Sequence, residues 1–353
     1  MATNAAIGDM EAAPVQVLIV DDSIVARAVL RRIIEGDPRY HVAAAVGDAR
    51  AAIAFLMQER VDIVLLDIEM PGESGLSALP EILRAGRGAR VLIVSSTSAP
   101  GAEASVRALA LGAADTLVKP GAGVLAGRFA QALAERLARL SSESHAAAEP
   151  FEEIAAPVGQ RREVPRVIAI GASTGGIHAL GRLLGEFDAG CSSPILVTQH
   201  LPASFMPYFA AQLAQLAKRP CLVAEDRMRL RAGHLYVAPG DAHLTCAAMT
   251  DGYLIRLDRR PVESGCLPSV DPMLASVGDV FGTGAVGVVL SGMGRDGAVG
   301  ARRLIDNGGT LMAQDRETSV VWGMPGAVAS FAEAVLPPEA IGRALRQRFE
   351  GAR

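Results

Sequence analysis

A serine, a histidine and an aspartate that each follow a strand-like run could together carry out acyl transfer. Ser173 lies in IGASTGGIHAL, His200 ends PILVTQH, and Asp296 follows AVGVVLSGMG. A serine hydroxyl is a weak nucleophile unless a neighbouring base takes its proton and an acid orients that base. The three residue types would therefore supply a nucleophile, its base and the acid that orients the base.

Three interpretations of the glycine-rich turn around Ser173 remain open on this stretch alone. A strand-to-helix turn can hold a phosphate, but GASTGG matches neither G-x-G-x-x-G nor G-x₄-G-K-[ST], and no lysine follows the glycines. Ser173 or Thr174 could instead cap the following helix. In the third interpretation the turn raises Ser173 beside backbone N–H groups that stabilise an oxyanion. A histidine and an acid at other strand ends favour this third interpretation.

His200 is the preferred base because it ends a strand and so shares a sheet edge with Ser173. Asp296 is the preferred acid, and Asp271 is its rival, although a place just before a helix suits Asp271 for capping. We expect activity to fall as the pH drops below about 6 to 7, since a base must be neutral. The other histidines lie in the first half, the linker, a helix or a predicted hairpin: His41, His145, His178, His234 and His243.

A second group of polar residues ends strand-like runs nearer the start of the chain. Carboxylates suit Mg²⁺, while a lysine and a hydroxyl neutralise phosphoryl oxygens. Each residue alone has a simpler explanation, because a strand-end aspartate often caps a helix and Lys-Pro is often a turn. Together they predict Mg²⁺-assisted phosphoryl transfer to an aspartate. The residues are Asp21, Asp22, Asp67, Ser95 and Lys119.

Two parallel sheets are needed to position these two groups. Over residues 15–140 strand-like runs alternate with amphipathic stretches, which predicts five βα units on a parallel sheet. A second alternating series over 165–350 predicts a doubly wound, mostly parallel α/β domain with a short β-hairpin near 234–258. Residues 141–164 lose the strand signal and contain two prolines, as a linker would.

Composition limits the classes of function. The chain has 353 residues, a net charge of −4 and no long basic cluster, so we expect no nucleic-acid partner. No apolar run approaches about 20 residues, and the first residues lack a signal-peptide pattern, so we expect a cytoplasmic monomer without membrane insertion. The four cysteines are widely spaced without a CxxC pair, which argues against a zinc site or a disulfide framework.

The first domain resembles the receiver domain of two-component response regulators through LIVDDS, LLDIEMPGESGL, IVSS and LVKP. The resemblance implies a flavodoxin-like fold in which a histidine kinase phosphorylates Asp67. It also implies that Ser95 and Lys119 contact the phosphoryl group. The Mg²⁺ ligands that it implies are Asp21, Asp22, Asp67 and the backbone carbonyl of Glu69.

One position departs from the receiver pattern. Receivers usually carry Tyr or Phe three residues before the lysine, whereas this chain has Thr116. We therefore expect the phosphorylation switch to act through the Ser95 loop and helix shifts, without an aromatic reporter.

Residues 165–350 resemble the catalytic domain of the chemotaxis protein-glutamate methylesterase (CheB) family. The resemblance rests on IGASTGG, VTQHLPASF, LYVAPGDAHL, PSVDPML, LSGMGRDGA and AQDRETSVVWGMPGAV. That family hydrolyses glutamate methyl esters on methyl-accepting chemotaxis receptors, and many members deamidate receptor glutamines. The resemblance implies Ser173 as nucleophile, His200 as base and Asp296 as its orienting acid, without a cofactor for the esterase reaction. It also implies that backbone N–H groups at Thr174 and Met293 hold the oxyanion.

The two resemblances together predict a methylesterase regulated by phosphorylation, in which the unphosphorylated receiver covers the Ser173 crevice. Two other functions remain open. One is a binding module whose hydrolase domain does no chemistry, and the other is a general serine esterase under two-component control.

Overall fold

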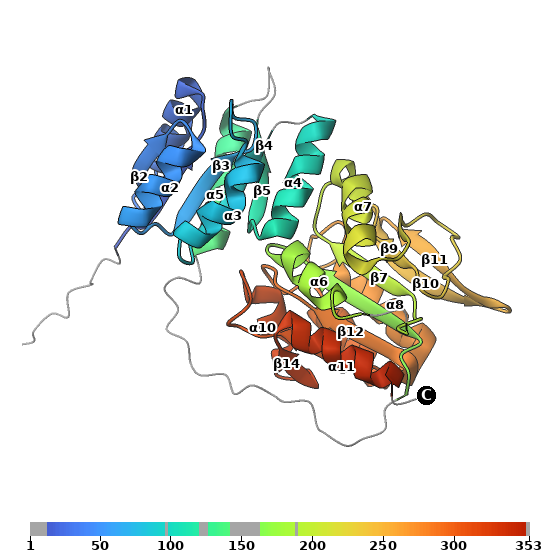
Figure 1. Ribbon diagram of the computed structural model, residues 1–353. Helices are drawn as coiled ribbons and strands as arrows, with labels where there is room; N and C mark the ends of the chain where they lie inside the picture. The colour runs from blue at the N-terminus through green and yellow to red at the C-terminus, as the bar shows by residue number, and fades with distance from the viewer. Residues whose placement is uncertain (1–12, 96–97, 120–125, 142–162, 188–189, 351–353) are drawn as a thin grey trace, which may run out of the picture.

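The chain folds into two α/β domains, each built on a parallel sheet (Figure 1). The computed structural model describes residues 13–95, 98–119, 126–141, 163–187 and 190–350. The predicted fold class is confirmed for both domains. The predicted linker at 141–164 falls almost entirely outside the described residues, so the domain boundaries stay a prediction.

The first sheet contains five parallel strands in the order β2-β1-β3-β4-β5. Its central strand β3 is almost entirely apolar and fully buried, as expected where helices cover both faces of a sheet. The strands are β1 (Val15–Val20), β2 (Tyr40–Val46), β3 (Ile63–Asp67), β4 (Arg90–Ser95) and β5 (Asp115–Val118). The helices are α1 (Ile24–Ile34), α2 (Ala49–Gln58), α3 (Gly75–Ala85), α4 (Ala99–Leu111) and α5 (Ala126–Ser141).

Short polar residues start the first helices. Ser23, Asp48, Ser74 and Ser98 each accept a hydrogen bond from a backbone N–H in the first turn of the helix that follows. Such caps satisfy N–H groups that the helix itself leaves free. The pattern of apolar run, capping residue and amphipathic stretch therefore explains the five predicted βα units.

The second sheet contains seven parallel strands in the order β14-β13-β12-β6-β7-β9-β8. The strands are β6 (Val167–Ala172), β7 (Ile195–Gln199), β8 (Cys221–Val223), β9 (Leu235–Val237), β12 (Ala285–Val289), β13 (Thr310–Gln314) and β14 (Ala334–Leu336). The α-helices are α6 (Gly176–Leu184), α7 (Met206–Ala217), α8 (Val270–Phe281), α9 (Ala298–Asp306), α10 (Gly323–Ala329) and α11 (Pro338–Glu350). Two 3₁₀ turns are η1 (Ala203–Phe205) and η2 (Gly282–Gly284).

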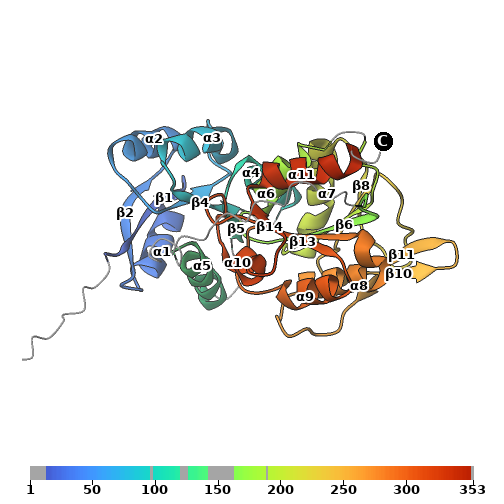
Figure 2. The same ribbon diagram turned by 90° about the horizontal axis from the view of Figure 1, so that it is seen from below.

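The β-hairpin is shorter than predicted. It consists of the antiparallel strands β10 (His243–Met249) and β11 (Gly252–Asp258). Leu235–Val237, which the prediction placed in the hairpin, is strand β9 of the main sheet and pairs in parallel with β7. A strand of three residues is too short to show a period. The hairpin extends from the side of the second domain that faces away from the first (Figures 1 and 2).

The two domains pack directly against each other through α4. This helix of the first domain lies against α6, α7 and η1 of the second (Figure 1). Buried apolar side chains of both domains belong to one hydrophobic cluster. Among the described residues, no helix has both the length and the apolar character that crossing a membrane requires.

Candidate active site

Three neighbouring strands bring the predicted catalytic residues to one sheet edge. Ser173 follows β6 directly, and His200 follows β7 directly. Asp296 lies in the loop between β12 and α9. Since β12, β6 and β7 are adjacent and parallel, their carboxyl ends meet at the same edge, where α/β sheets bind ligands.

The turn after β6 is not built as a helix cap. Gly175 occupies the N-cap position of α6 with φ +76°, and no side chain caps the helix. The backbone N–H of Gly175 donates to the Ala114 carbonyl of the first domain, and that of Gly176 donates to the Ser173 carbonyl. These amides are thus occupied within the protein, which argues against both the capping and the phosphate-binding interpretations.

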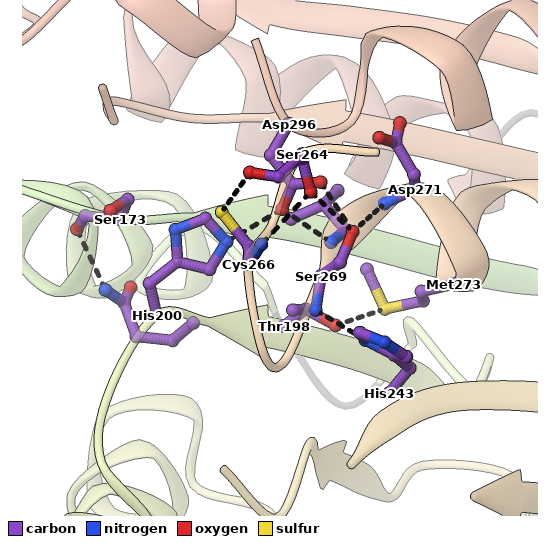
Figure 3. Close-up of polar contacts among 12 residues, drawn as sticks. Ser173, Thr198, His200, His243, Ser264, Cys266, Ser269, Asp271, Met273 and Asp296 are labelled. Carbon is purple, nitrogen blue, oxygen red and sulfur yellow. Dashed lines mark hydrogen bonds and ion pairs between the residues drawn. The ribbon is translucent and has the colours of Figure 1, made fainter. Parts of the chain in front are cut away.

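His200 and Asp296 are hydrogen-bonded in a buried network (Figure 3). His200 Nε2 lies 2.8 Å from Asp296 Oδ2, and the aspartate is 2% exposed. Ser269 Oγ donates to Asp296 Oδ1 at 2.6 Å, and the backbone N–H of Val270 donates to Oδ2 at 2.8 Å. The rival acid Asp271 instead accepts from the backbone N–H of Gly300 at 2.8 Å.

The network changes the protonation of its members. Burial alone would lower the pKa of His200, but the contacts with Asp296 and with the Cys266 thiol raise it to about 9. Burial would raise the pKa of Asp296, yet the hydrogen bonds from His200 and Ser269 hold it well below its usual range. The pH below which activity is expected to fall therefore rises from 6–7 to about 9, because a raised pKa keeps His200 protonated up to a higher pH.

Ser173 is fixed through its backbone. Its N–H donates to the Ser291 carbonyl at 3.0 Å, and its carbonyl accepts from Gln199 Nε2 at 2.8 Å. Figure 3 shows the His200 ring between Ser173 on one side and Asp296 on the other. Within the described part of the chain the Ser173 hydroxyl makes no hydrogen bond to His200. Such catalytic bonds are often long before substrate binds.

The predicted oxyanion residues lie on either side of Ser173. Thr174 is buried, whereas the Met293 side chain is 46% exposed. Gly292 allows the segment before Met293 to lie close to Ser173. A Cβ on Gly292 would lie 2.7 Å from the Ser173 Cβ and 2.4 Å from the Met324 sulfur. Any larger residue at this position would displace the nucleophile turn.

Several residues that support the site were not predicted as site residues, although Ser269 lies in PSVDPML and His243 lies in LYVAPGDAHL. Ser269 is the N-cap of α8 and also a hydrogen-bond donor to Asp296. His243 Nδ1 accepts from the backbone N–H of Ser269 and so fixes this loop. Cys266 approaches His200 and Asp296 from the loop before α8. Gln199 lies next to His200 in VTQHLPASF, so of these four residues only Cys266 lies outside the stretches that carry the resemblance.

The first domain covers the mouth of the site. A cavity of about 360 Å³ is lined on one side by Ser173 and His200 and on the other by Asp115, Arg136 and Arg139. Thr174 Oγ1 donates to Asp115 Oδ2 at 3.4 Å. Other contacts across the interface join Gly175 to Ala114 and His178 to the Ala110 carbonyl.

A separate cluster of charges lies at the carboxyl edge of the first sheet. Lys119 Nζ is 2.6 Å from Asp67 Oδ2 and 3.0 Å from Asp21 Oδ2. Asp21, Asp22 and Asp67 each place a carboxylate oxygen within 4.8 Å of the others. Burial raises the pKa of Asp67, and the Lys119 contact opposes that rise. Within the described residues the Lys119 ammonium is the partner of the buried Asp21 Oδ2, and the set of three carboxylates fits a hard divalent cation.

The remaining predicted residues of the first domain surround this cluster. The backbone N–H of Glu69 donates to Asp67 Oδ1 at 3.2 Å. Ser95 is fully buried, and its hydroxyl accepts from Ser105 of α4 at 2.7 Å. Thr116 is buried in β5, and its carbonyl accepts from Arg136 at 2.8 Å. Ser95 therefore joins the charge cluster to α4, the helix that packs on the second domain.

Comparisons with known proteins show the family to which the chain belongs. Residues 168–345 match a family described as CheB methylesterase, and residues 17–125 match the response regulator receiver domain. The protein-glutamate methylesterase/protein-glutamine glutaminase 1 of Paramagnetospirillum magneticum is 37% identical over 92% of this chain and 93% of its own. The corresponding protein 2 of Caulobacter vibrioides is 41% identical over 94% and 98%. The crystal structure of the Thermotoga maritima CheB methylesterase catalytic domain covers 52% of this chain and 98% of its own, at 34% identity and a TM-score of 0.50.

Proposed function

The chain belongs to the CheB methylesterase family, and from that premise we propose that it is a protein-glutamate methylesterase regulated by phosphorylation. Its substrates are glutamate methyl esters on methyl-accepting chemotaxis receptors, and it also deamidates receptor glutamines. The observation that carries the proposal is the buried hydrogen bond of 2.8 Å between His200 and Asp296, beside Ser173 at the shared sheet edge.

The proposed reaction is acyl transfer in two steps. His200 Nδ1, the ring nitrogen not bonded to Asp296, takes the proton of the Ser173 hydroxyl as its oxygen attacks the ester carbonyl. The protonated His200 then gives this proton to the leaving methoxide, and methanol departs. Water repeats the sequence on the acyl-serine and releases the glutamate carboxylate. Backbone N–H groups at Thr174 and Met293 hold the oxyanion, at roughly 3 kcal/mol per donor.

Asp296 keeps His200 in the reactive orientation. Its carboxylate accepts from His200 Nε2, so the imidazole presents the lone pair of Nδ1 toward the serine. The hydrogen bonds from Ser269 and Val270 fix the carboxylate in turn. Ser173, His200 and Asp296 therefore act as one unit in this proposal.

In the first domain the proposed phosphate acceptor is Asp67. Its carboxylate oxygen attacks the phosphorus of a phosphohistidine on a histidine kinase, and the P–N bond breaks. Asp21, Asp22, Asp67 and the Glu69 carbonyl would hold Mg²⁺, which neutralises phosphoryl oxygens. Lys119 pairs with a phosphoryl oxygen, and the Ser95 hydroxyl leaves Ser105 to donate to another.

Phosphorylation opens the catalytic site in this proposal. The contact of Asp115 with Thr174 and that of Ala114 with Gly175 hold the unphosphorylated receiver over the cavity. When the Ser95 hydroxyl leaves Ser105, α4 shifts its position, and this helix packs on α6 and α7. The receptor helix then reaches Ser173. We place this monomeric enzyme in the cytoplasm, with receptors and a kinase as its partners.

The test is methanol release from methylated receptor by the phosphorylated full chain. The Ser173→Ala variant should lose activity by more than about 10³-fold, because no other hydroxyl can form the acyl-enzyme. Ser330→Ala, an exposed serine at the end of α10, is the matched control and should keep the wild-type rate. Retained activity in Ser173→Ala, with an unchanged melting temperature, would refute the assignment.

The same assay separates the alternatives. A binding module would release no methanol from any substrate. A general esterase would hydrolyse small methyl esters as fast as it hydrolyses the receptor ester, whereas we expect a preference for the receptor.

A further inference from the structure

Cys266 adds a sulfur to the nitrogen and oxygen of the catalytic pair. One ligand atom each from His200, Cys266 and Asp296 lies within 4.8 Å of the other two. The three residues come from the end of β7, the loop before α8 and the loop after β12. Their wide spacing in the sequence had argued against a zinc site, but the fold brings them together (Figure 3).

We propose that His200, Cys266 and Asp296 form an inhibitory binding site for a borderline-soft divalent cation of the Zn²⁺ type. Imidazole nitrogen, thiolate sulfur and carboxylate oxygen are the ligands that Zn²⁺ takes in proteins, and three protein ligands with one open position are common. Here the open position faces the cavity of about 360 Å³ that Ser173, His200 and Cys266 line.

The surroundings already hold two of these ligands in place. Ser269 Oγ and the Val270 N–H bond the Asp296 carboxylate independently of His200, as partners of a metal-bound carboxylate do. The cation would replace the hydrogen bond between His200 and Asp296 and the long contact of 3.8 Å that the Cys266 thiol donates to the Ser264 carbonyl. Cys266 is half-buried and lies in a loop, so its thiol needs only a small movement. Binding releases the thiol proton.

Binding would disable the proposed base. In its reactive, neutral form the His200 imidazole carries a single N–H, which lies on Nε2 and faces Asp296. When Nε2 gives its lone pair to the cation, the ring proton moves to Nδ1. The nitrogen that faced the serine then has no lone pair for the Ser173 proton, and catalysis stops. This inhibition rests on the proposed function, whereas binding of the cation does not.

The charge cluster of the first domain provides a contrast within the same chain. Its donors are all carboxylate oxygens, which suit Mg²⁺, and it has no sulfur or imidazole ligand among the described residues. Assays in millimolar Mg²⁺ therefore keep that cluster occupied while Zn²⁺ is varied.

The experiment titrates Zn²⁺ into metal-free full-length protein in millimolar Mg²⁺ and follows methanol release. Micromolar Zn²⁺ should inhibit the wild type, and added chelator should restore its rate. Cys266→Ser should raise the half-inhibitory concentration by more than about tenfold, since even the loss of an outer-shell partner costs roughly 10- to 100-fold in affinity. Cys221→Ser, on edge strand β8, is the matched control and should leave Zn²⁺ sensitivity unchanged.

A second readout follows binding without activity. Zn²⁺ should protect Cys266 from alkylation by iodoacetamide, measured by peptide mass spectrometry, and should leave alkylation of Cys221 unchanged. Equal Zn²⁺ inhibition of wild type and Cys266→Ser, or absence of protection at Cys266, would overturn the proposal. Protection of Cys266 in a protein that releases no methanol would support the cation site and refute the proposed function instead.

Discussion

The two sites lie at the same kind of sheet edge but balance their charges in opposite ways. At the first, two of the three clustered carboxylates, those of Asp21 and Asp67, pair with one ammonium, that of Lys119. At the second, the single carboxylate of Asp296 is satisfied by His200, Ser269 and the Val270 N–H. An excess of negative charge favours a cation, whereas a satisfied network keeps its geometry. The first site therefore has negative charge left to balance, whereas the carboxylate of the second is already held by its neighbours.

Strand β5 connects the two sites. Lys119 of the charge cluster follows the end of β5, and Asp115, which contacts Thr174, begins it. The strand has only four residues. A change at one end therefore needs to travel only a short distance to reach the interface, in addition to the route through Ser95 and α4.

The largest expected effect concerns the catalytic site of the second domain. Asp296→Asn should reduce the rate of methanol release by about 10⁴-fold, because the amide no longer holds the imidazole in the reactive tautomer. Asp279→Asn is the matched control, because Asp279 lies on α8 and pairs with Arg303 at the surface, and it should cost less than about tenfold. Similar losses in both variants would show that Asp296 has no special role.

The second largest expected effect is the dependence of kcat/KM on pH. Because His200 has a pKa of about 9 and must be neutral to act, kcat/KM should rise almost tenfold per pH unit well below that value, or roughly 50-fold between pH 7 and 9. The measurement is the pH profile of unphosphorylated full-length protein in the presence of a chelator. A profile that levels off near pH 6.5 would show that the contacts of His200 do not stabilise its charged form.

Removal of the first domain tests whether this domain restricts access to Ser173. A protein of residues 160–353 should release methanol about tenfold faster than the unphosphorylated full chain, a coupling in the usual range between sites. Equal rates would mean that the receiver does not restrict access to Ser173.

A smaller effect is expected from a single interface contact. Asp115→Ala removes the acceptor of the Thr174 hydroxyl and should raise the unphosphorylated rate about fivefold, while the phosphorylated rate stays the same. Asp37→Ala changes an exposed carboxylate that pairs with Arg39 and should have no effect. If both variants have the same unphosphorylated rate, Asp115 does not help the first domain to restrict access to Ser173.

Much of this architecture could be predicted because its signals are local. Apolar runs such as β3 and β12 are buried on both faces, and caps such as Ser23 mark where helices begin. The short strands β8, β9 and β14 have three residues each, too few to show a pattern. β9 and β14 pair with the longer strands β7 and β13, and β8 in turn pairs with β9.

The candidate site was predictable only in part for the same reason. Ser173, His200 and Asp296 each follow a strand, and the order of the strands brings them together. Ser269 and Cys266 reach Asp296 and His200 from a loop without a periodic signal. Their contacts depend on tertiary packing, which spacing along the chain does not encode. The roles of all these residues in catalysis stay predictions.

The most direct test of the account is whether a phosphoryl mimic at Asp67 controls chemistry at Ser173. Methanol release from methylated receptor would be measured with and without beryllofluoride and Mg²⁺, for wild type and for Asp67→Asn. The account predicts a rate increase of about tenfold in the wild type and none in Asp67→Asn. An unchanged wild-type rate, or the same increase in Asp67→Asn, would contradict it.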